Sequence, residues 1–526
     1  MGGNHRTAVR ANGRVSSLAR ETLTAAIDAW VWRIRAGYRS HPWWGVRGNP
    51  VVPGTPPSMS PPHQSSPILP ETRRGRAGIP LGLLRAAAWP LASFHPETVP
   101  AVSRANYRRE LVYTFLFSTT LAVVEGGILG VLVKNAFAGV VHDGWLAAVV
   151  ALLGAAPEAA NITSFVWNTL AHGRDKVLLI NRVQIATLVL VAIVPTVPRS
   201  AVGLAVLVVA VVAARVCITG VITLRATLWR ANYSRFHRAR ATGKFSTVSV
   251  LVIAGTGFLF GRGMDRWEEC FRVFIPVVCV LGLAGTLAYG RIRMRGGRAA
   301  AKAERMDGTG ALASFKPSAM LELLRSDRHY AKFMASMFIL GFGNLMLPVP
   351  LVIGLKDRFD QGYLGGIVVI SSIPFLVMPW FVPLWAKLLA RVHVVRFRSI
   401  HSWFFVGAQG VVMLAFVTQS YWMLYFSAVF LGIAYGGGSL AWNLGHLDFA
   451  PGPKAAQYMG VHVTLNGVRG VVAPFFAAGM YRTLEQWRPG SGWMVFGASV
   501  ILCILGALGF VALGRAMGDG VRRVKE

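Results

Sequence analysis

The sequence predicts an all-α integral membrane protein with twelve transmembrane helices, arranged as two pseudo-repeated bundles of six. Of its 526 residues, 54% are hydrophobic and only 14% are charged, whereas about 25% are charged in an ordinary soluble domain. One globular core cannot hide so many apolar residues. Apolar stretches of about 20 residues also recur along the chain, and each is long enough to cross a hydrocarbon core. Backbone groups find no water partner there, so each stretch is expected to be helical.

The first 106 residues form a basic, proline-rich tail that we expect to be cytoplasmic. Residues 15–39 have the pattern of an amphipathic helix, with Leu23, Ile27, Trp30 and Ile34 on one face. Residues 42–70 are rich in Pro and Ser and are typical of a linker, and residues 79–94 favour a short interfacial segment. The tail is either a surface-binding element or a poorly ordered extension.

Twelve spans are predicted after this tail, in a first bundle over residues 107–290 and a second bundle over 332–526. A basic cytoplasmic linker over residues 291–331 joins the two bundles. The expected spans are 111–133, 144–170, 177–197, 201–224, 243–261, 272–290, 332–355, 363–385, 401–418, 422–444, 457–480 and 492–514.

The net charge of +32 is a possible sign of nucleic-acid binding, but its distribution argues against that function. The basic residues occupy alternate loops, as the positive-inside rule requires, and both termini are then cytoplasmic. One such loop is predicted after the eighth span, with Lys387, Arg391, Arg396 and Arg398. The intervening loops are nearly neutral. Composition favours a bacterial inner membrane, with an organellar transit peptide as the alternative.

A short motif that recurs at equivalent positions of the two halves supports an internal repeat. Trp167-x-x-Leu170 in the first half and Trp385-x-x-Leu388 in the second each precede a basic turn. This architecture resembles the major facilitator superfamily of secondary transporters. The family's loop Gly-x-Leu-Ala-Asp-Arg-x-Gly-Arg corresponds here to residues 168–176, in which Leu170 and Ala171 match. The resemblance makes His172, Arg174 and Lys176 the candidate gating loop, although His172 replaces the gating Asp.

Ionisable residues near the middle of a span are costly and usually face a bundle interior or a wet cavity. The four candidates are Glu125, Glu158, Arg215 and Arg469. They either form buried ion pairs that fix helix register or take part in transport. A carboxylate in a low-dielectric site can exchange a proton near neutral pH, so Glu125, and after it Glu158, is the candidate for proton coupling.

A polar stripe on the eleventh span provides candidate solute ligands. Tyr458, His462, Asn466 and Arg469 lie at i, i+4, i+8 and i+11, hence on one helix face. Arg215 and Arg469, one in each half, are candidates to hold an anionic or zwitterionic solute. Asn161 extends the face of Glu158, and Asn344 precedes Pro348 and Pro350, where a helix could break near the site.

These features predict a secondary active transporter that moves a small solute by alternating access and uses a proton or another coupling ion. The alternatives are efflux of apolar or cationic compounds and a non-transporting scaffold or sensor. No Walker motif, nucleophile–base set or metal-ligand spacing is present. We therefore expect no enzyme activity, no cofactor and no metal; the partners are the solute, the ion and the lipid bilayer.

Overall fold

The computed structural model describes residues 93–307, 317–450 and 455–518. By its internal contacts the chain divides into Met1–Thr98 and Val99–Glu526, and the second unit holds all the membrane helices. The predicted amphipathic helix over 15–39, the linker over 42–70 and nearly all of the apolar segment 79–94 lie outside the described residues.

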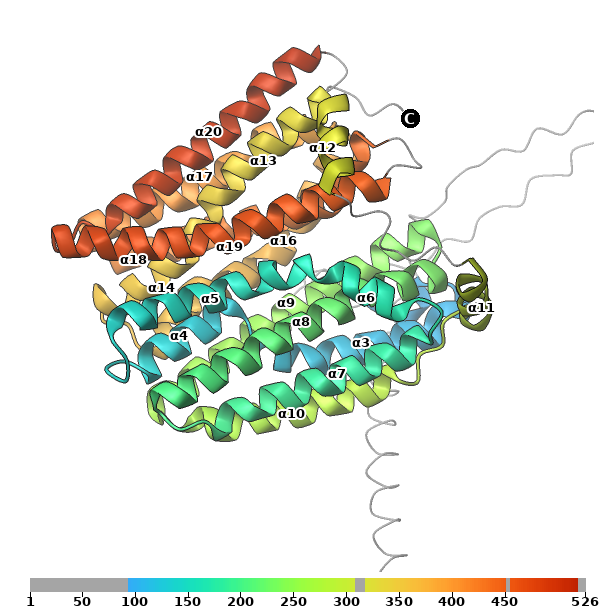
Figure 1. Cartoon of the computed structure of the whole chain (residues 1–526), viewed down its shortest axis with the longest axis horizontal. Coiled ribbons are helices and arrows are strands. Elements are labelled where there is room, and N and C mark those ends of the chain that lie inside the picture. Colours follow the sequence, from blue (N-terminus) through green and yellow to red (C-terminus); the bar gives the residue numbers. More distant parts are fainter. Residues whose placement is uncertain (1–92, 308–316, 451–454, 519–526) are drawn as a thin grey trace, which may run out of the picture. The chain divides into compact units, whose positions relative to one another are not determined.

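The twelve predicted spans are confirmed, and the described part of the second unit is entirely helical apart from its connections (Figure 1). The first half comprises α3 (Ala101–Val123), α4 (Gly126–Ala136), α5 (Asp143–Ile162), α6 (Ser164–Ala171), α7 (Lys176–Ile193), α8 (Ala201–Asn232), α9 (Arg235–Arg266) and α10 (Cys270–Tyr289). The connection between the halves contains α11 (Gly297–Asp307) and α12 (Pro317–Ser326). The second half comprises α13 (Arg328–Met346), α14 (Pro348–Asp357), α15 (Tyr363–Ile367), the π-helical turn η4 (Val368–Ser372), α16 (Ile373–Leu389), α17 (Val394–Thr418), α18 (Tyr421–Leu444), α19 (Ala455–Trp487) and α20 (Trp493–Met517).

Polar residues between the apolar stretches fix where several helices begin. The Asp175 carboxylate accepts hydrogen bonds from the backbone amides of Val177 (2.9 Å) and Leu178 (3.1 Å) at the start of α7. Asp327 accepts in the same way from the amide of Tyr330 (2.9 Å) at the start of α13. Such caps satisfy amides that lack a partner within the helix, so these residues set the boundaries of the spans.

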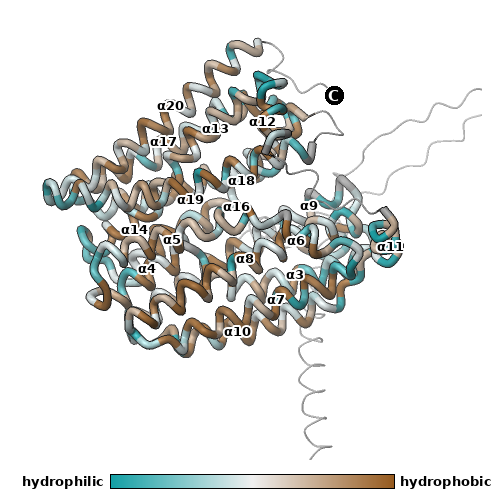
Figure 2. The backbone as a smooth tube through the Cα atoms, in the orientation of Figure 1, coloured by the Kyte–Doolittle hydropathy of each residue, from teal (hydrophilic) through white to brown (hydrophobic). Residues whose placement is uncertain are grey.

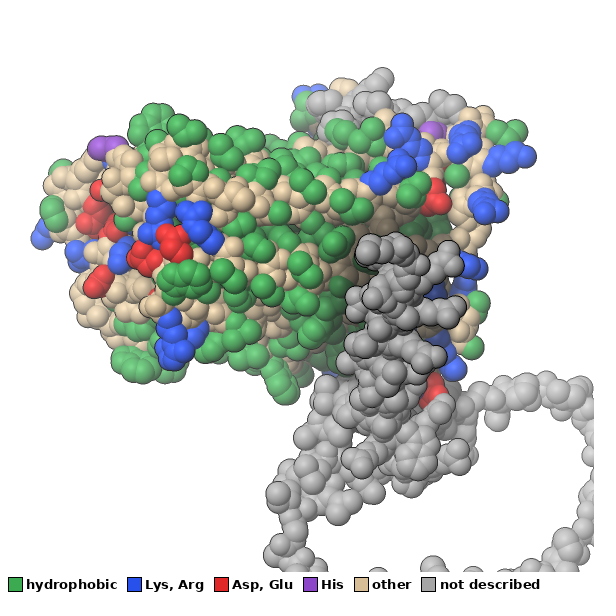
Figure 3. Space-filling view, turned by 90° about the horizontal axis from the view of Figure 1, so that it is seen from below, with side chains coloured by type: hydrophobic (Ala, Val, Ile, Leu, Met, Phe, Trp, Pro, Cys, Tyr) green, Lys and Arg blue, Asp and Glu red, His purple; other side chains and the backbone are tan. Residues whose placement is uncertain are grey.

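The two ends of the helix bundle differ in charge. We call the end that holds α11 and α12 the linker end, and the end that holds the turns after α4 and α14 the turn end. Figure 2 shows apolar residues along the helices and polar residues near the helix ends. In Figure 3 a broad hydrophobic band separates the turn end, where acidic and basic side chains mix, from the linker end, where basic ones predominate. Several turn-end charges are paired, as in Arg199–Glu268 (2.7 Å).

Three of the predicted spans are interrupted, which corrects the prediction of continuous helices over 111–133 and 144–170. The first span breaks at Val124–Glu125, the second at Thr163 and the seventh at Leu347. At the first break Arg215 donates a hydrogen bond to the backbone oxygen of Val124. A backbone group freed inside the membrane needs such a partner, because no water is available there. At the third break Pro348 lacks the N–H that would continue the helix.

The prediction that Arg398 belongs to a loop is wrong. Helix α17 begins at Val394, about two turns earlier than the predicted start at residue 401, because Asp448 accepts from the Val394 amide (2.7 Å) and His393 from the Val395 amide (3.3 Å). Arg396 stays exposed, whereas the Arg398 side chain turns into the bundle and is only 3% exposed. An arginine in the second turn of a span looks in the sequence like part of the basic loop before it.

Candidate solute cavity

A cavity of about 580 Å³ lies between the two halves of the membrane unit. The first half contributes residues of α4, α5 and α9, and the second half contributes residues of α13, α14, η4 and α16 to α19. Its wall is mainly apolar, with a few converging charged and amide side chains, which is the usual composition of a small-molecule site. Both predicted coupling carboxylates, Glu125 and Glu158, line it.

Glu158 lies where the halves touch. Its carboxylate accepts hydrogen bonds from the Asn161 side chain on its own helix (3.2 Å) and from Asn466 on α19 of the other half. Glycines make this approach possible, because a Cβ atom on Gly470 would collide with the side chain of Glu158. Small residues such as glycine on one membrane helix let the backbone of a neighbouring helix approach closely. One carboxylate therefore connects the two halves beside the cavity.

Arg469 stands next to this contact, and it is 7% exposed. It donates hydrogen bonds to the backbone oxygen of Met337 and to the side-chain oxygen of Asn466 (2.6 Å). Asn466 thus links the Glu158 carboxylate to the Arg469 guanidinium. Among the described residues no carboxylate lies within ion-pair distance of Arg469.

Arg215 is placed behind Glu125 rather than in the cavity wall. Its guanidinium lies 3.2 Å from the Glu125 carboxylate and also binds the freed backbone oxygen of Val124. Glu125 lines the cavity, whereas Arg215, which is 8% exposed, is not among the lining residues. The structure therefore makes Arg215 the partner of a wall carboxylate at a helix break.

Arg398 is a cavity residue that the sequence pattern did not reveal. Its guanidinium lies 3.4 Å from the Nδ1 atom of His401, and the Nε2 atom of His401 lies 2.7 Å from the backbone oxygen of Ala434. None of the carboxylates in the described ranges pairs with it. The signal in the sequence is the stripe Arg398, His401 and Phe405, at i, i+3 and i+7 of a span that begins earlier than predicted.

The predicted polar stripe of the eleventh span divides into two parts. Asn466 and Arg469 line the cavity, as do Asn161 and Asn344. His462 is buried beside the edge of Trp442, with 5.6 Å between ring centroids, and Trp442 forms the wall.

Tyr458 lies nearer the linker end and is not a lining residue. Its hydroxyl donates to the Asp327 carboxylate (2.8 Å), and its backbone oxygen accepts from the hydroxyl of Tyr330 (2.6 Å).

The predicted gating loop lies outside the cavity and is bound by α11. The Glu304 carboxylate accepts from Lys176 (2.7 Å) and from the amide of Gly173 (2.9 Å), while Arg305 donates to the backbone oxygen of Gly173 (2.6 Å). Partial burial opposes ionisation of Glu304, but the bonds from Lys176 and Gly173 outweigh it and hold the pKa of Glu304 below its usual value. His172 and Arg174 flank this contact.

Further interactions join the halves from the cavity to the turn end. Asp265, at the end of α9, accepts from the first amides of α15, those of Tyr363 (2.8 Å) and Leu364 (3.2 Å). Lys134 on α4 pairs with Asp357 on α14 (2.9 Å). In Figure 1 α4 and α5 lie close to α14 and α19, while α11 and α12 lie apart at the linker end. These contacts close the cavity on the turn side.

Comparisons with known proteins agree with this architecture. The family model described as Major Facilitator Superfamily matches residues 115–474, more than half of the chain. No curated protein matches the sequence significantly.

Solved structures share the fold at low identity. A D-xylose–proton symporter superposes with a TM-score of 0.60 at 12% identity, covering 78% of this chain and 97% of its own. The xylose transporter XylE from E. coli in an inward open conformation gives 0.57 at 12%, covering 77% and 95%. The POT family transporter PepTSo gives 0.59 at 10%, covering 80% and 99%. With its twelve spans in two halves around a central cavity, this chain belongs to the Major Facilitator Superfamily of membrane transporters.

Proposed function

We propose that the protein is a proton-coupled secondary transporter that carries a small anionic or zwitterionic solute through the cavity between its halves. One observation carries this proposal. The Glu158 carboxylate of the first half accepts a hydrogen bond from Asn466 of the second half, at the cavity wall and beside Arg469. A proton-exchanging group thus lies on the contact that must open and close during alternating access.

The coupling follows from the chemistry of that contact. An ionised Glu158 attracts the amide hydrogens of Asn161 and Asn466 and the nearby Arg469 guanidinium, because charge-assisted hydrogen bonds are roughly twice as strong as neutral ones. Protonation removes the charge, weakens the link between α5 and α19 and favours separation of the halves on the turn side. Release of the proton restores the link. The D-xylose–proton symporter with the same fold supports such coupling by analogy.

The arginines of the second half indicate the charge of the solute. Arg398 and Arg469 both line the cavity, and no carboxylate among the described residues lies within ion-pair distance of either guanidinium, although Glu158 attracts Arg469 from farther away. A buried guanidinium without a counter-ion is costly, and it is the side chain best suited to bind a carboxylate in two-point fashion. A solute carboxylate would therefore complete the site. Tyr435, Ser439 and Asn443 of α18 supply further polar groups on the same wall.

Glu125 offers a second position for a proton. It lines the cavity at the break between α3 and α4, where Arg215 holds it. Its protonation would release the Arg215 guanidinium from one of its two acceptors and loosen the break. Glu158 acts on the contact between the halves, whereas Glu125 acts on the shape of the first span.

The distribution of charge supports one orientation of the protein in the membrane. Basic side chains predominate at the linker end, whereas at the turn end they are mixed with acidic ones (Figure 3) and several form ion pairs. By the positive-inside rule this distribution supports the proposal that the linker end and both termini face the cytoplasm, as in a bacterial inner membrane. In that proposed orientation, the contacts at the turn end close the cavity of the described state toward the outside.

The test is proton flux in liposomes that contain the purified full chain and a trapped pH indicator. Amino acids, small carboxylic acids and neutral sugars are added in separate arms. We expect a carboxylate-bearing solute to drive proton movement. Glu158→Gln should abolish that movement, and the matched variant Glu322→Gln, on the exposed face of α12, should retain it.

Three results would contradict the proposal: flux that Glu158→Gln leaves intact, flux lost equally in both variants, or a response to neutral sugars alone. Circular dichroism and gel filtration establish beforehand that each variant is folded.

A further inference from the structure

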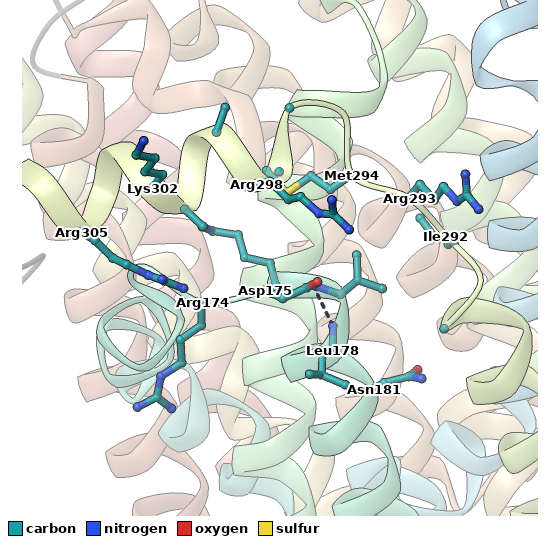
Figure 4. A pocket seen from close by; sticks show the side chains of 17 residues that line it. Arg174, Asp175, Leu178, Asn181, Ile292, Arg293, Met294, Arg298, Lys302 and Arg305 are labelled. Carbon is teal, nitrogen blue, oxygen red and sulfur yellow. Dashed lines mark hydrogen bonds between the residues drawn. The ribbon is translucent and has the colours of Figure 1, made fainter.

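A second hollow, of about 1220 Å³, lies at the linker end and away from the central cavity. It is bounded by the loop before α7, by the start of α7, by the segment after α10 and by α11 (Figure 4). The positively charged residues that line it are Arg174, Lys176, Arg293, Arg298, Lys302 and Arg305, and its one acidic residue is Asp175. None of this wall takes part in the proposed transport mechanism.

The charge of this hollow is largely uncompensated. Asp175 is engaged as the cap of α7, where its carboxylate accepts from two backbone amides. Glu304 neutralises Lys176 from outside the wall. No carboxylate of the described residues lies within ion-pair distance of Arg174, Arg298 or Lys302. On α11, Arg298 and Lys302 are four residues apart and so share one helix face.

The hollow is held in shape by the same contacts that fix α11. Glu304 and Arg305 fasten α11 to Gly173, whose φ of +67° favours glycine. On the opposite side Asn181 of α7 packs against Gly290, where a Cβ atom would collide with it. The basic side chains therefore surround a concave site built on three anchored segments, which distinguishes it from a merely basic loop.

The surroundings of the hollow are apolar on the membrane side. Leu178, which belongs to the wall, is 51% exposed, and Leu287 near the end of α10 is 57% exposed. Ile185 and Val189 continue the exposed apolar surface along α7. In a protein that spans a bilayer, such surfaces face hydrocarbon. A ligand here meets cations at the membrane boundary and an apolar surface directly beside them.

We propose that this hollow binds the phosphate-bearing headgroup of an anionic phospholipid, whose acyl chains lie along α7 and α10. Clusters of basic side chains between membrane helices recognise such headgroups. A free phosphate ion shares the headgroup chemistry, but it would leave the exposed apolar surface unused and most of the volume unfilled. The lipid satisfies both the cations and the adjoining apolar side chains.

The test is lipid retention by the purified full chain in native mass spectrometry, with phosphatidylglycerol, cardiolipin or phosphatidylcholine added in separate arms. The variant is the double substitution Arg298→Ala with Lys302→Ala. The matched control is Arg391→Ala with Arg396→Ala, two exposed arginines at the linker end of the other half. Because each basic side chain near an anionic surface contributes about fivefold in affinity, the double variant should weaken anionic-lipid binding by about thirtyfold, and the control should not.

Inorganic phosphate, added alone in a thermal-shift arm, separates the two sources of the chemistry. We expect anionic lipid, but not millimolar phosphate, to raise the melting temperature, and the Arg298/Lys302 variant to lose that rise. Equal stabilisation by phosphate would overturn the lipid assignment. Equal loss in the control variant, or no preference for anionic over zwitterionic lipid, would overturn the site itself.

Discussion

At the scale of single residues, the buried charges of the membrane unit fall into two groups. Arg215 and Arg225 have carboxylate partners, Glu125 at 3.2 Å and Glu110 at 2.9 Å. Arg398 and Arg469 reach the cavity and bind only neutral groups of the described chain. The paired arginines stabilise the first half. In the proposed mechanism, the two arginines without an ion-pair partner attract the solute, and this difference separates the proposed binding residues from the structural ones.

Replacing Arg398 with Ala should therefore weaken solute binding more than folding. Loss of a charged hydrogen-bonding partner costs about 1.5–3 kcal/mol, which is roughly a ten- to hundredfold rise in the half-saturating concentration. Solute uptake into proteoliposomes, recorded over a range of solute concentrations, measures this half-saturating concentration. Arg396→Ala, on the same helix but exposed, serves as the control. An Arg398→Ala carrier with unchanged half-saturation would remove this residue from the binding site.

From the sequence, cavity residues could be predicted only where a polar side chain interrupts an otherwise apolar segment. Glu125, Glu158, Asn466 and Arg469 stand alone in such runs, so they could be predicted and indeed line the cavity. Arg398 could not, because it adjoins a basic loop and only the early start of α17 brings it into the bundle. Tyr458 was predicted with the others by spacing. Its hydrogen bond to Asp327, which lies far away in sequence, is a tertiary contact that spacing does not reveal.

At the scale of elements, the contact between α5 and α19 depends on the absence of side chains on α19. A Cβ atom at Gly467 would collide with Ile162, and one at Gly470 would collide with Glu158. Hydropathy predicted both spans, because a run of apolar residues suffices for that. The helix break at Glu125 depends on its arginine partner, and the break at Leu347 depends on the proline that follows it. A hydropathy average over a whole span does not reveal such single residues.

Gly470→Ala should disturb this contact. Alanine favours a helix by up to about 1 kcal/mol over glycine, but overpacking costs about 1–3 kcal/mol, so the net effect should be destabilising. The lower melting temperature should appear in thermal unfolding followed by tryptophan fluorescence. Gly479→Ala is the control on the same helix, because nothing lies within 4 Å of its added Cβ atom. Equal melting temperatures for the two variants would show that the glycine contact is loose.

The attachment of α11 to the loop around Gly173 should depend on pH. The pKa of Glu304 is lower in the folded protein than the unfolded value of about 4.3. Its ionised form therefore stabilises the attachment fully above about pH 4.3, and that contribution disappears as the pH falls through the lower, folded pKa.

A fluorescent label at Lys302 should report release of α11 only in this acidic range. In Glu304→Gln the same signal should be present at all pH values. A label response centred near neutral pH would assign the release to another group.

At the scale of the whole molecule, the two halves meet on the turn side of the cavity. Asp265 caps the first amides of α15 across the interface, and Lys134 pairs with Asp357. In the family resemblance an Asp of the loop between spans 2 and 3 has a gating role, but His172 occupies that place here. A carboxylate that holds a helix terminus of the other half is found instead at the opposite end, on Asp265.

The central claim is that protonation of Glu158 opens the turn side. Spin labels at Val202 and Trp422, both exposed near the turn end, report the separation of the halves by pulsed electron resonance. The four native cysteines are first replaced by serine or alanine.

We predict that lowering the pH from about 8 to about 5 lengthens the distance in the otherwise wild-type chain. Glu158→Gln should hold the long distance at both pH values. A distance that changes with pH in the same way in both proteins would contradict the account.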